Sequence, residues 1–294
     1  MAGMSAVRQS PHASRRSVYN APDLTSMIHD PTHLYMSSVT LHYIDQGEGS
    51  PVVILHGLFG SSRNWSPIAA RLAPSHRVVS VDLRNHGASG HAPTMGFPEL
   101  AGDVIALLDD LGIRETAVIG HSLGGKTAMT LALLHGDRVS RLAVVDIAPA
   151  PYQNNLLHLV EALESVPVDS IATRKQADGI LSRMIPASAL RRFLMQNLVL
   201  ENNKYRWRIN LPAIRANMRY ISGFPEELGG RSFTGPALFL RGADSNYIRP
   251  EHHDVIRNYF PRASIEEIGN AGHWVHADQP EIVIALLDEF LDGK

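Results

Sequence analysis

Short apolar segments alternate with amphipathic ones along most of the chain after about His33. Leu100, Val104, Leu108 and Leu111 show the amphipathic spacing, since they fall on one face of a helix. The apolar segments carry no charge, which predicts strands buried on both faces of a parallel sheet. These segments are Pro51–Leu55, Val78–Val81, Ala117–Ile119, Leu142–Val145 and Ala237–Leu240. The alternation predicts an α/β fold with a mostly parallel, doubly wound sheet.

Two segments depart from this alternation. Val39–Ile44, which ends near Gly47, indicates part of an antiparallel hairpin at the sheet edge. Between about Pro151 and Phe233 the pattern becomes mostly helical, in Leu156–Leu163, Ala177–Met184 and Leu190–Leu198. We expect this insertion to be a cap over the carboxyl ends of the strands, where open α/β sheets bind ligands. The predicted organisation is a leader (1–33), a first core part (34–150), a helical cap (151–235) and a second core part (236–294).

The composition excludes several classes of protein. With 294 residues, the chain is long enough for one large domain or for one domain with an insertion. It has no cysteine, which excludes disulfides, thiolate metal sites and a cysteine nucleophile. A net charge of −2 argues against a nucleic-acid partner, and no apolar run is long enough to predict a membrane span.

The first 21 residues differ from the rest in composition. They contain no acidic residue, while Arg8, Arg15 and Arg16 occur among several serines. Such a segment is typical of an organellar transit peptide, and the alternative is a disordered tail. Because it lacks the apolar region of a secretory signal, we expect a cytoplasmic or mitochondrial protein that is not secreted.

The strongest chemical signal is the run Gly120-His121-Ser122-Leu123-Gly124, which lies between a predicted strand and a predicted helix. A serine on such a tight turn takes strained backbone angles and projects its hydroxyl above the sheet. Its neighbours must be small for strand and helix to approach each other. This context predicts Ser122 as a nucleophile.

The same residues also match a phosphate-binding loop, since Gly120–Thr127 reads GHSLGGKT in one-letter code. In that alternative, Lys126 would contact phosphate and Asp146, after an apolar strand, would help to hold magnesium. A nucleotide hydrolase would leave the histidine and glycine motifs discussed next without a role.

The run His56-Gly57-Leu58-Phe59-Gly60 follows the first predicted buried strand. Acyl transfer requires two backbone N–H donors for the oxyanion. We expect one from Leu123, directly after the nucleophile, and the other from Leu58 in this loop.

A general base and an acid are expected further along the chain. His273 follows the strand-like Ser264–Ile268 and fits the order serine, acid, histidine of hydrolase triads, whereas His276 is expected to be structural. Two aspartates remain as alternative acids, namely Asp146 after one strand and Asp244 after the next.

No metal or cofactor is implied. The pairs His252 with His253 and His273 with His276 have no acidic or histidine partner at ligand spacing.

Taken together, these motifs resemble the YbfF-type esterases, which include bacterial enzymes and a mitochondrial branch of abhydrolase-domain proteins. The resemblance covers about Leu41 to Leu291 and is carried by HGLFGSSRNW, VDLRNHGASGH, GHSLGGKTAM, VVDIAPAPY, YRWRINLPAI and NAGHWVHADQP. It implies an α/β-hydrolase that cleaves esters or thioesters beneath a small helical cap. It also implies Ser122 as nucleophile, His273 as base and, in preference to Asp244, Asp146 as acid. A mitochondrial branch gives the transit-peptide interpretation further support.

We therefore expect a serine hydrolase acting on a small-molecule ester or thioester, of acyl or acyl-CoA type. The alternative from another class is a slow hydrolase that serves as a ligand receptor or protein partner. An apolar acyl pocket is predicted from Phe59, Trp65, Leu156, Leu159, Phe193, Leu194 and Trp207, which could equally be packing residues of the cap. Trp207 lies between Arg206 and Arg208, where it could recognise an anionic group such as a coenzyme A phosphate.

Overall fold

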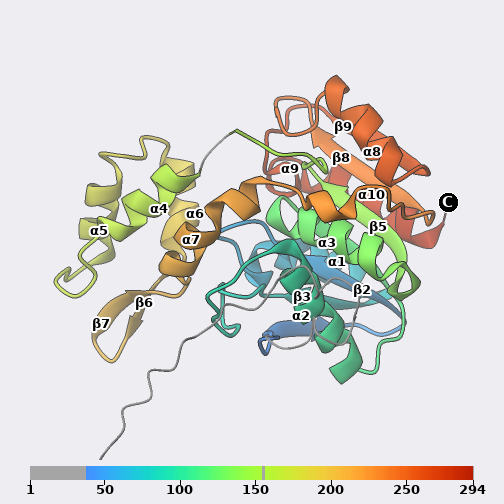
Figure 1. Ribbon diagram of the computed structural model, residues 1–294. Helices are drawn as coiled ribbons and strands as arrows, with labels where there is room; N and C mark the ends of the chain where they lie inside the picture. The colour runs from blue at the N-terminus through green and yellow to red at the C-terminus, as the bar shows by residue number, and fades with distance from the viewer. Residues whose placement is uncertain (1–37, 154–155, 294) are drawn as a thin grey trace, which may run out of the picture. The chain divides into compact units, whose positions relative to one another are not determined.

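The computed structural model of the protein describes residues 38–153 and 156–293. Within them, seven strands form one mixed sheet in the order β1-β3-β2-β4-β5-β8-β9 (Figure 1). The bounds are β1 Tyr43–Gln46, β2 Ser50–Leu55, β3 His76–Val81, β4 Thr116–His121, β5 Val139–Val145, β8 Ala237–Gly242 and β9 Ala263–Ile268. All neighbours pair in parallel except β1. The predicted α/β fold with a mostly parallel sheet is therefore confirmed.

The edge strand β1 differs in one respect from the prediction. It is antiparallel, as expected, but it pairs with β3, where Tyr43 lies opposite Val81, and not with the next strand in a hairpin. The reason is that β2 already has neighbours on both sides, β3 and β4. The open edge of the sheet belongs to β3, so β1 pairs there. This strand begins at His76, 26 residues after the start of β2 at Ser50.

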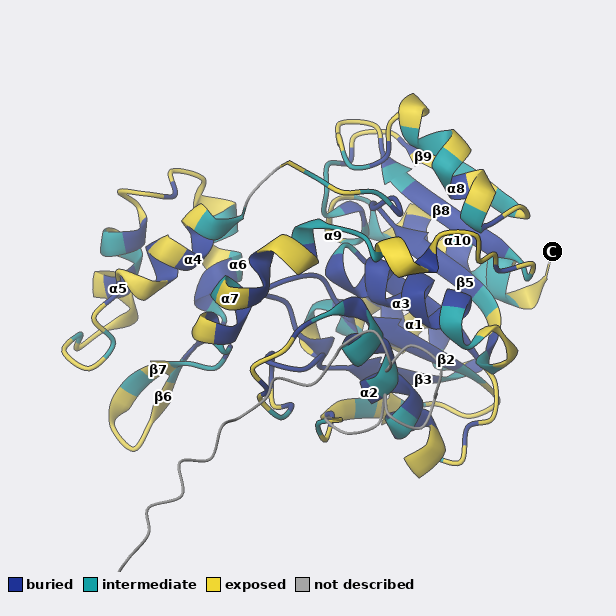
Figure 2. Cartoon of the chain, in the orientation of Figure 1, coloured by how far each residue is buried: buried dark blue, intermediate teal, exposed yellow. Residues whose placement is uncertain are grey.

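Helices cover both faces of the sheet. On one face, α1 (Ser66–Leu72) and α10 (Pro280–Asp292) pack against Val52 and Ile54 of β2. On the other face, α2 (Phe97–Asp110), α3 (Leu123–Leu134) and α8 (His253–Tyr259) pack over alternate residues such as Val53. Figure 2 shows the resulting band of buried residues along the central strands. Each large apolar side chain buried there contributes about 1.5–3 kcal/mol, so the strands and helices form a rigid base for the loops that follow them.

The segment between β5 and β8 contains α4 (Leu157–Glu164), α5 (Arg174–Leu181), α6 (Ser188–Met195) and α7 (Leu211–Ser222). These helices lie together at one side of the sheet (Figure 1). The sequence pattern did not predict the hairpin of β6 (Leu198–Glu201) and β7 (Lys204–Trp207). Its turn residues Asn202 and Asn203 both have positive φ, of 50° and 60°, as a two-residue hairpin turn requires. The predicted helix 190–198 consequently ends at Met195.

The leader and its proposed transit peptide lie outside the described residues. Among the helices of the described ranges, none combines the length and apolar character of a membrane-spanning segment.

Candidate active site

Ser122 occupies the turn between β4 and α3 with a φ of 52° and a ψ of −114°. A serine in such a conformation costs about 1–3 kcal/mol, which the surrounding packing must offset. The close approach of the two elements explains the glycines on either side. A Cβ on Gly120 would lie 2.2 Å from the carbonyl oxygen of Gly124, and a Cβ on Gly124 would lie 2.3 Å from that of Leu55. Only glycine fits at either position, and these two glycines allow β4 and α3 to approach each other on both sides of Ser122.

The structure brings Asp146 and His273 together. Asp146 directly follows β5, is 0% exposed, and has its Oδ2 2.8 Å from the Nδ1 of His273. Its carboxylate also accepts from the backbone N–H of Gly242 at 3.1 Å and from the hydroxyl of Ser245. Asp244, the alternative acid, is exposed, and its backbone N–H donates to the carbonyl of Ala271. The carboxylate that faces the histidine is therefore that of Asp146.

His273 is held on two sides and lines the same cavity as Ser122. The ring of Tyr247 stacks on it with centroids 3.9 Å apart, and its backbone carbonyl lies 2.8 Å from the Nε2 of His121. Burial holds the pKa of His121 well below its usual range, so this ring is neutral. Its Nε2 must then carry the proton that it donates to the carbonyl. With 27% of its side chain exposed, His273 keeps access to the cavity.

The loop after β2 forms the opposite wall. The N–H of Phe59 donates to the Nε2 of His86 at 3.2 Å, and that of Gly60 donates to the carbonyl of Gly57. Burial lowers the pKa of His86 to about 3, which leaves its ring neutral and able to accept. The N–H groups of Phe59 and Gly60 thus already have acceptors, whereas Leu58 lines a cavity together with Ser122.

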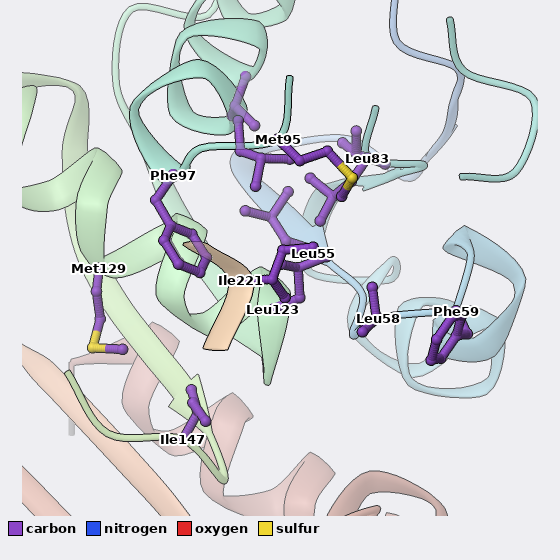
Figure 3. Close-up of a cluster of buried hydrophobic side chains, with 14 of the residues drawn as sticks. Leu55, Leu58, Phe59, Leu83, Met95, Phe97, Leu123, Met129, Ile147 and Ile221 are labelled. Atoms are coloured by element: carbon purple, nitrogen blue, oxygen red, sulfur yellow. The ribbon is translucent and has the colours of Figure 1, made fainter. Parts of the chain in front are cut away.

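Leu123 is the second expected donor. It is the first residue of α3, where backbone N–H groups have no partner within the helix. Leu58 and Leu123 both line a cavity with Ser122 and lie among the buried apolar side chains drawn in Figure 3. The structure thus gathers both expected oxyanion donors beside the serine.

A cavity of about 380 Å³ opens at Ser122 and His273. Its apolar walls come from the core and from cap helices α4 and α6. Five of the seven predicted pocket residues line it: Phe59, Trp65, Leu156, Leu159 and Phe193.

The other two predicted pocket residues, Leu194 and Trp207, are not part of this lining. Leu194 is fully buried, and the indole N–H of Trp207 donates to the carbonyl of Leu163 within the cap. Arg206 forms an ion pair with Glu201 across the β6–β7 hairpin. Trp207 therefore packs within the segment between β5 and β8, which is the alternative that the sequence left open for it.

Lys126 has no place in a phosphate site. It is 2% exposed, and its Nζ donates to the backbone carbonyls of Ser222 at 3.1 Å and of Gly223. The rings of Phe97 and Tyr152 lie 5.7 and 4.8 Å from the same atom. The lysine of the phosphate-binding pattern therefore contacts the end of cap helix α7, and the aspartate of that pattern contacts His273.

Sequence reasoning missed Ser245 and Tyr247. Both lie in the loop after β8, where Ser245 donates to Asp146 and Tyr247 covers His273. No local signal marked them, because serine and tyrosine are common in loops and their partners lie 99 and 26 residues away in the chain. Among the described residues, no group of three or more histidines and carboxylates could hold a metal ion.

A strained serine between strand and helix, beside an imidazole–carboxylate pair at the carboxyl edge of a parallel sheet, is the arrangement of α/β-hydrolases. A family model described as alpha/beta hydrolase fold matches residues 50–280, and the chain belongs to this family.

Relatives narrow the class. The chain is 40% identical over 250 residues to the sn-1-specific diacylglycerol lipase ABHD11 of Mus musculus, covering 82% of this chain and 80% of that one. It is 34% identical to Esterase YbfF of Escherichia coli (strain K12), covering 84% and 95%. A solved structure described as a marine microorganism esterase superposes with a TM-score of 0.84 at 38% identity, covering 86% of this chain and all of that one. The expected resemblance and the prediction of an esterase-type hydrolase are confirmed.

Proposed function

We propose that this protein hydrolyses carboxylic esters, and thioesters by the same route, through an acyl-enzyme on Ser122. The observation that carries the proposal is the buried Asp146–His273 pair beside a serine held at φ 52°. In this scheme His273 takes the hydroxyl proton as Ser122 attacks the carbonyl carbon. The backbone N–H groups of Leu58 and Leu123 stabilise the oxyanion.

The second half of the reaction follows from the same groups. His273 gives its proton to the departing alkoxide or thiolate, and then activates a water that releases the acid from Ser122. Asp146 keeps Nδ1 of His273 protonated, so that Nε2 is the nitrogen that takes and gives the proton. The neutral state of His121 suits this role, since a second positive ring would oppose the imidazolium.

The experiment is hydrolysis of p-nitrophenyl esters from acetate to laurate by the wild type and by Ser122→Ala. We expect kcat to fall by about 10⁴-fold or more in the variant, with unchanged folding by circular dichroism. The matched control is Ser182→Ala, which removes an exposed hydroxyl in the cap and should retain full activity. A wild type that is inert on every ester, or a Ser122→Ala variant of full activity, would contradict the proposal.

A stoichiometric label gives an independent measurement. A fluorophosphonate should add one phosphonyl group to the wild type, at Ser122, and none to Ser122→Ala. Modification at another serine would place the nucleophile elsewhere.

A further inference from the structure

Two cavities of very different size meet at Ser122. The larger one, of about 380 Å³, extends beneath α4 and α6, whereas the smaller one, of about 40 Å³, lies over the start of α3. Four residues line both cavities, namely Leu58, Ser122, Leu156 and Tyr247. An ester bound at Ser122 therefore has two directions available, one for its acyl chain and one for its alcohol.

The position of His273 indicates which cavity would take the alcohol and which would take the acyl chain. Gly272, His273 and Trp274 line the large cavity and are not part of the lining of the small one. The leaving oxygen must lie within hydrogen-bond reach of His273 to receive its proton, so the alcohol starts on the side of the large cavity. The carbonyl oxygen is directed to the N–H groups of Leu58 and Leu123. Leu58 and Leu123 also line the small cavity, so the carbonyl oxygen lies at its wall and the rest of the cavity is the direction that remains for the acyl chain.

Buried residues form part of the wall of the small cavity. Lys126, Ile147 and Ile221 line it, and each is at most 8% exposed. Lys126 cannot swing aside without giving up its bonds to the carbonyls of Ser222 and Gly223. Figure 3 shows Ile221 beside Leu123, with Ile147 further away in the same cluster of buried apolar side chains. This part of the wall therefore belongs to α3, α7 and the loop after β5, and the half-buried Tyr152 and Ser222 also line the cavity.

We infer that the small cavity is the acyl subsite, and that this protein is selective for short-chain acyl esters of larger apolar alcohols. A volume of about 40 Å³ holds about three water-sized groups, which matches the carbon tail of acetyl to butyryl esters. The large apolar cavity accommodates the alcohol. This inference rests on the proposed function, because it assigns its two subsites to the acyl-enzyme reaction at Ser122.

A pair of isomeric esters tests the assignment directly. Hexyl acetate and ethyl hexanoate have the same atoms and similar hydrophobicity, but they exchange the long chain between alcohol and acid. We expect kcat/KM, measured by acid release at constant pH, to be at least about tenfold higher for hexyl acetate, because a chain that overfills a cavity of about 40 Å³ loses binding in the transition state. Equal values, or a preference for ethyl hexanoate, would overturn the inference while leaving ester hydrolysis intact. Failure of the wild type on both esters and on all p-nitrophenyl esters would overturn the proposed function and the inference together.

Variants in the two walls extend the test. Ile221→Ala enlarges the small cavity and should raise the ratio of hexanoate to acetate turnover by about tenfold. Its matched control is Leu159→Ala in the large cavity, which should change the dependence on alcohol length and leave the acyl ratio as it is. The opposite pattern, with the acyl ratio responding to Leu159→Ala alone, would reverse the assignment. The wild-type comparison needs neither variant to fold.

Discussion

The loops after β5 and β8 each carry an aspartate, but they place it in opposite surroundings. Asp146 is the first residue after β5, is fully buried, and accepts from Gly242, Ser245 and His273. Asp244 lies two residues beyond β8 and is exposed. The β8 loop thus supplies donors to the carboxylate of the β5 loop. Whether an aspartate can orient a histidine depends on its place in the loop and on its burial, since both loops offer the same side chain.

The largest expected effect that sharpens this comparison is that of Asp146→Asn. The amide has nearly the shape of the carboxylate but cannot stabilise a positive His273, and it favours the wrong tautomer. We expect kcat to fall by about 10⁴-fold in ester hydrolysis, as in comparable triads. A fall of less than about tenfold would show that the Asp146–His273 contact, at 2.8 Å, does not serve catalysis.

The second prediction concerns His86, which is as fully buried as Asp146 but carries no charge. Burial lowers its pKa from 6.5 to about 3, so below pH 6.5 the unfolded chain takes up a proton that the folded chain does not. Stability that is present above pH 6.5 is therefore lost as the pH falls toward 3. At about 1.4 kcal/mol for each pH unit, the full shift from 6.5 to about 3 corresponds to about 5 kcal/mol.

Urea unfolding at pH 8, 6 and 4.5 measures this effect. His86→Gln can still accept the N–H of Phe59 but does not titrate, so its free energy of unfolding should fall less steeply with pH than that of the wild type. His158→Gln, which changes an exposed histidine of α4, serves as the control and should follow the wild type. Parallel curves for all three proteins would contradict the prediction.

The third prediction concerns the hydroxyl of Ser245, which donates to the Oδ2 of Asp146. Hydrogen bonds to charged groups contribute about 1.5–3 kcal/mol, so Ser245→Ala should lower the free energy of unfolding by about 2 kcal/mol. Activity should fall far less than in Asp146→Asn, because Gly242 and His273 still contact the carboxylate. Denaturant unfolding and ester hydrolysis check both parts, and an unchanged midpoint would show that the bond adds no stability.

The sequence predicted those parts of the site that depend on local conformation. The apolar strands, the glycines around Ser122 and the loop containing Leu58 all follow from short-range sterics and burial, and the structure has them where the pattern placed them. Periodicity also predicted a helix through Leu100, Val104 and Leu108, and α2 (Phe97–Asp110) contains all three.

Features that depend on distant pairing were not predictable in this way. The partner of β1 follows from which sheet edge is left open, and the contact of Ser245 with Asp146 joins residues 99 positions apart. The two aspartates could not be separated by local pattern either, since both follow a strand. The β6–β7 hairpin carried a signal that could have been used, namely the adjacent Asn202 and Asn203.

The smallest expected effect is that of Asp244→Asn, which is also the most selective test of the comparison. The change removes one carboxylate charge from an exposed loop and leaves the backbone bond from its N–H to Ala271 in place. Both kcat/KM and the free energy of unfolding should therefore stay within about twofold and about 0.5 kcal/mol of the wild type.

The single variant Asp146→Asn retains Asp244, so the residual activity of that protein includes whatever Asp244 can supply to His273. If Asp244→Asn lowers this residual activity further, the exposed aspartate reaches His273 when Asp146 is lost. We expect no further loss, because a solvated carboxylate beyond Gly242 would have to give up its hydration to approach the ring and would find no buried donors prepared for it. Ester hydrolysis by Asp146→Asn and by Asp146→Asn/Asp244→Asn decides the point, and equal rates leave the buried position of Asp146 as the property that matters.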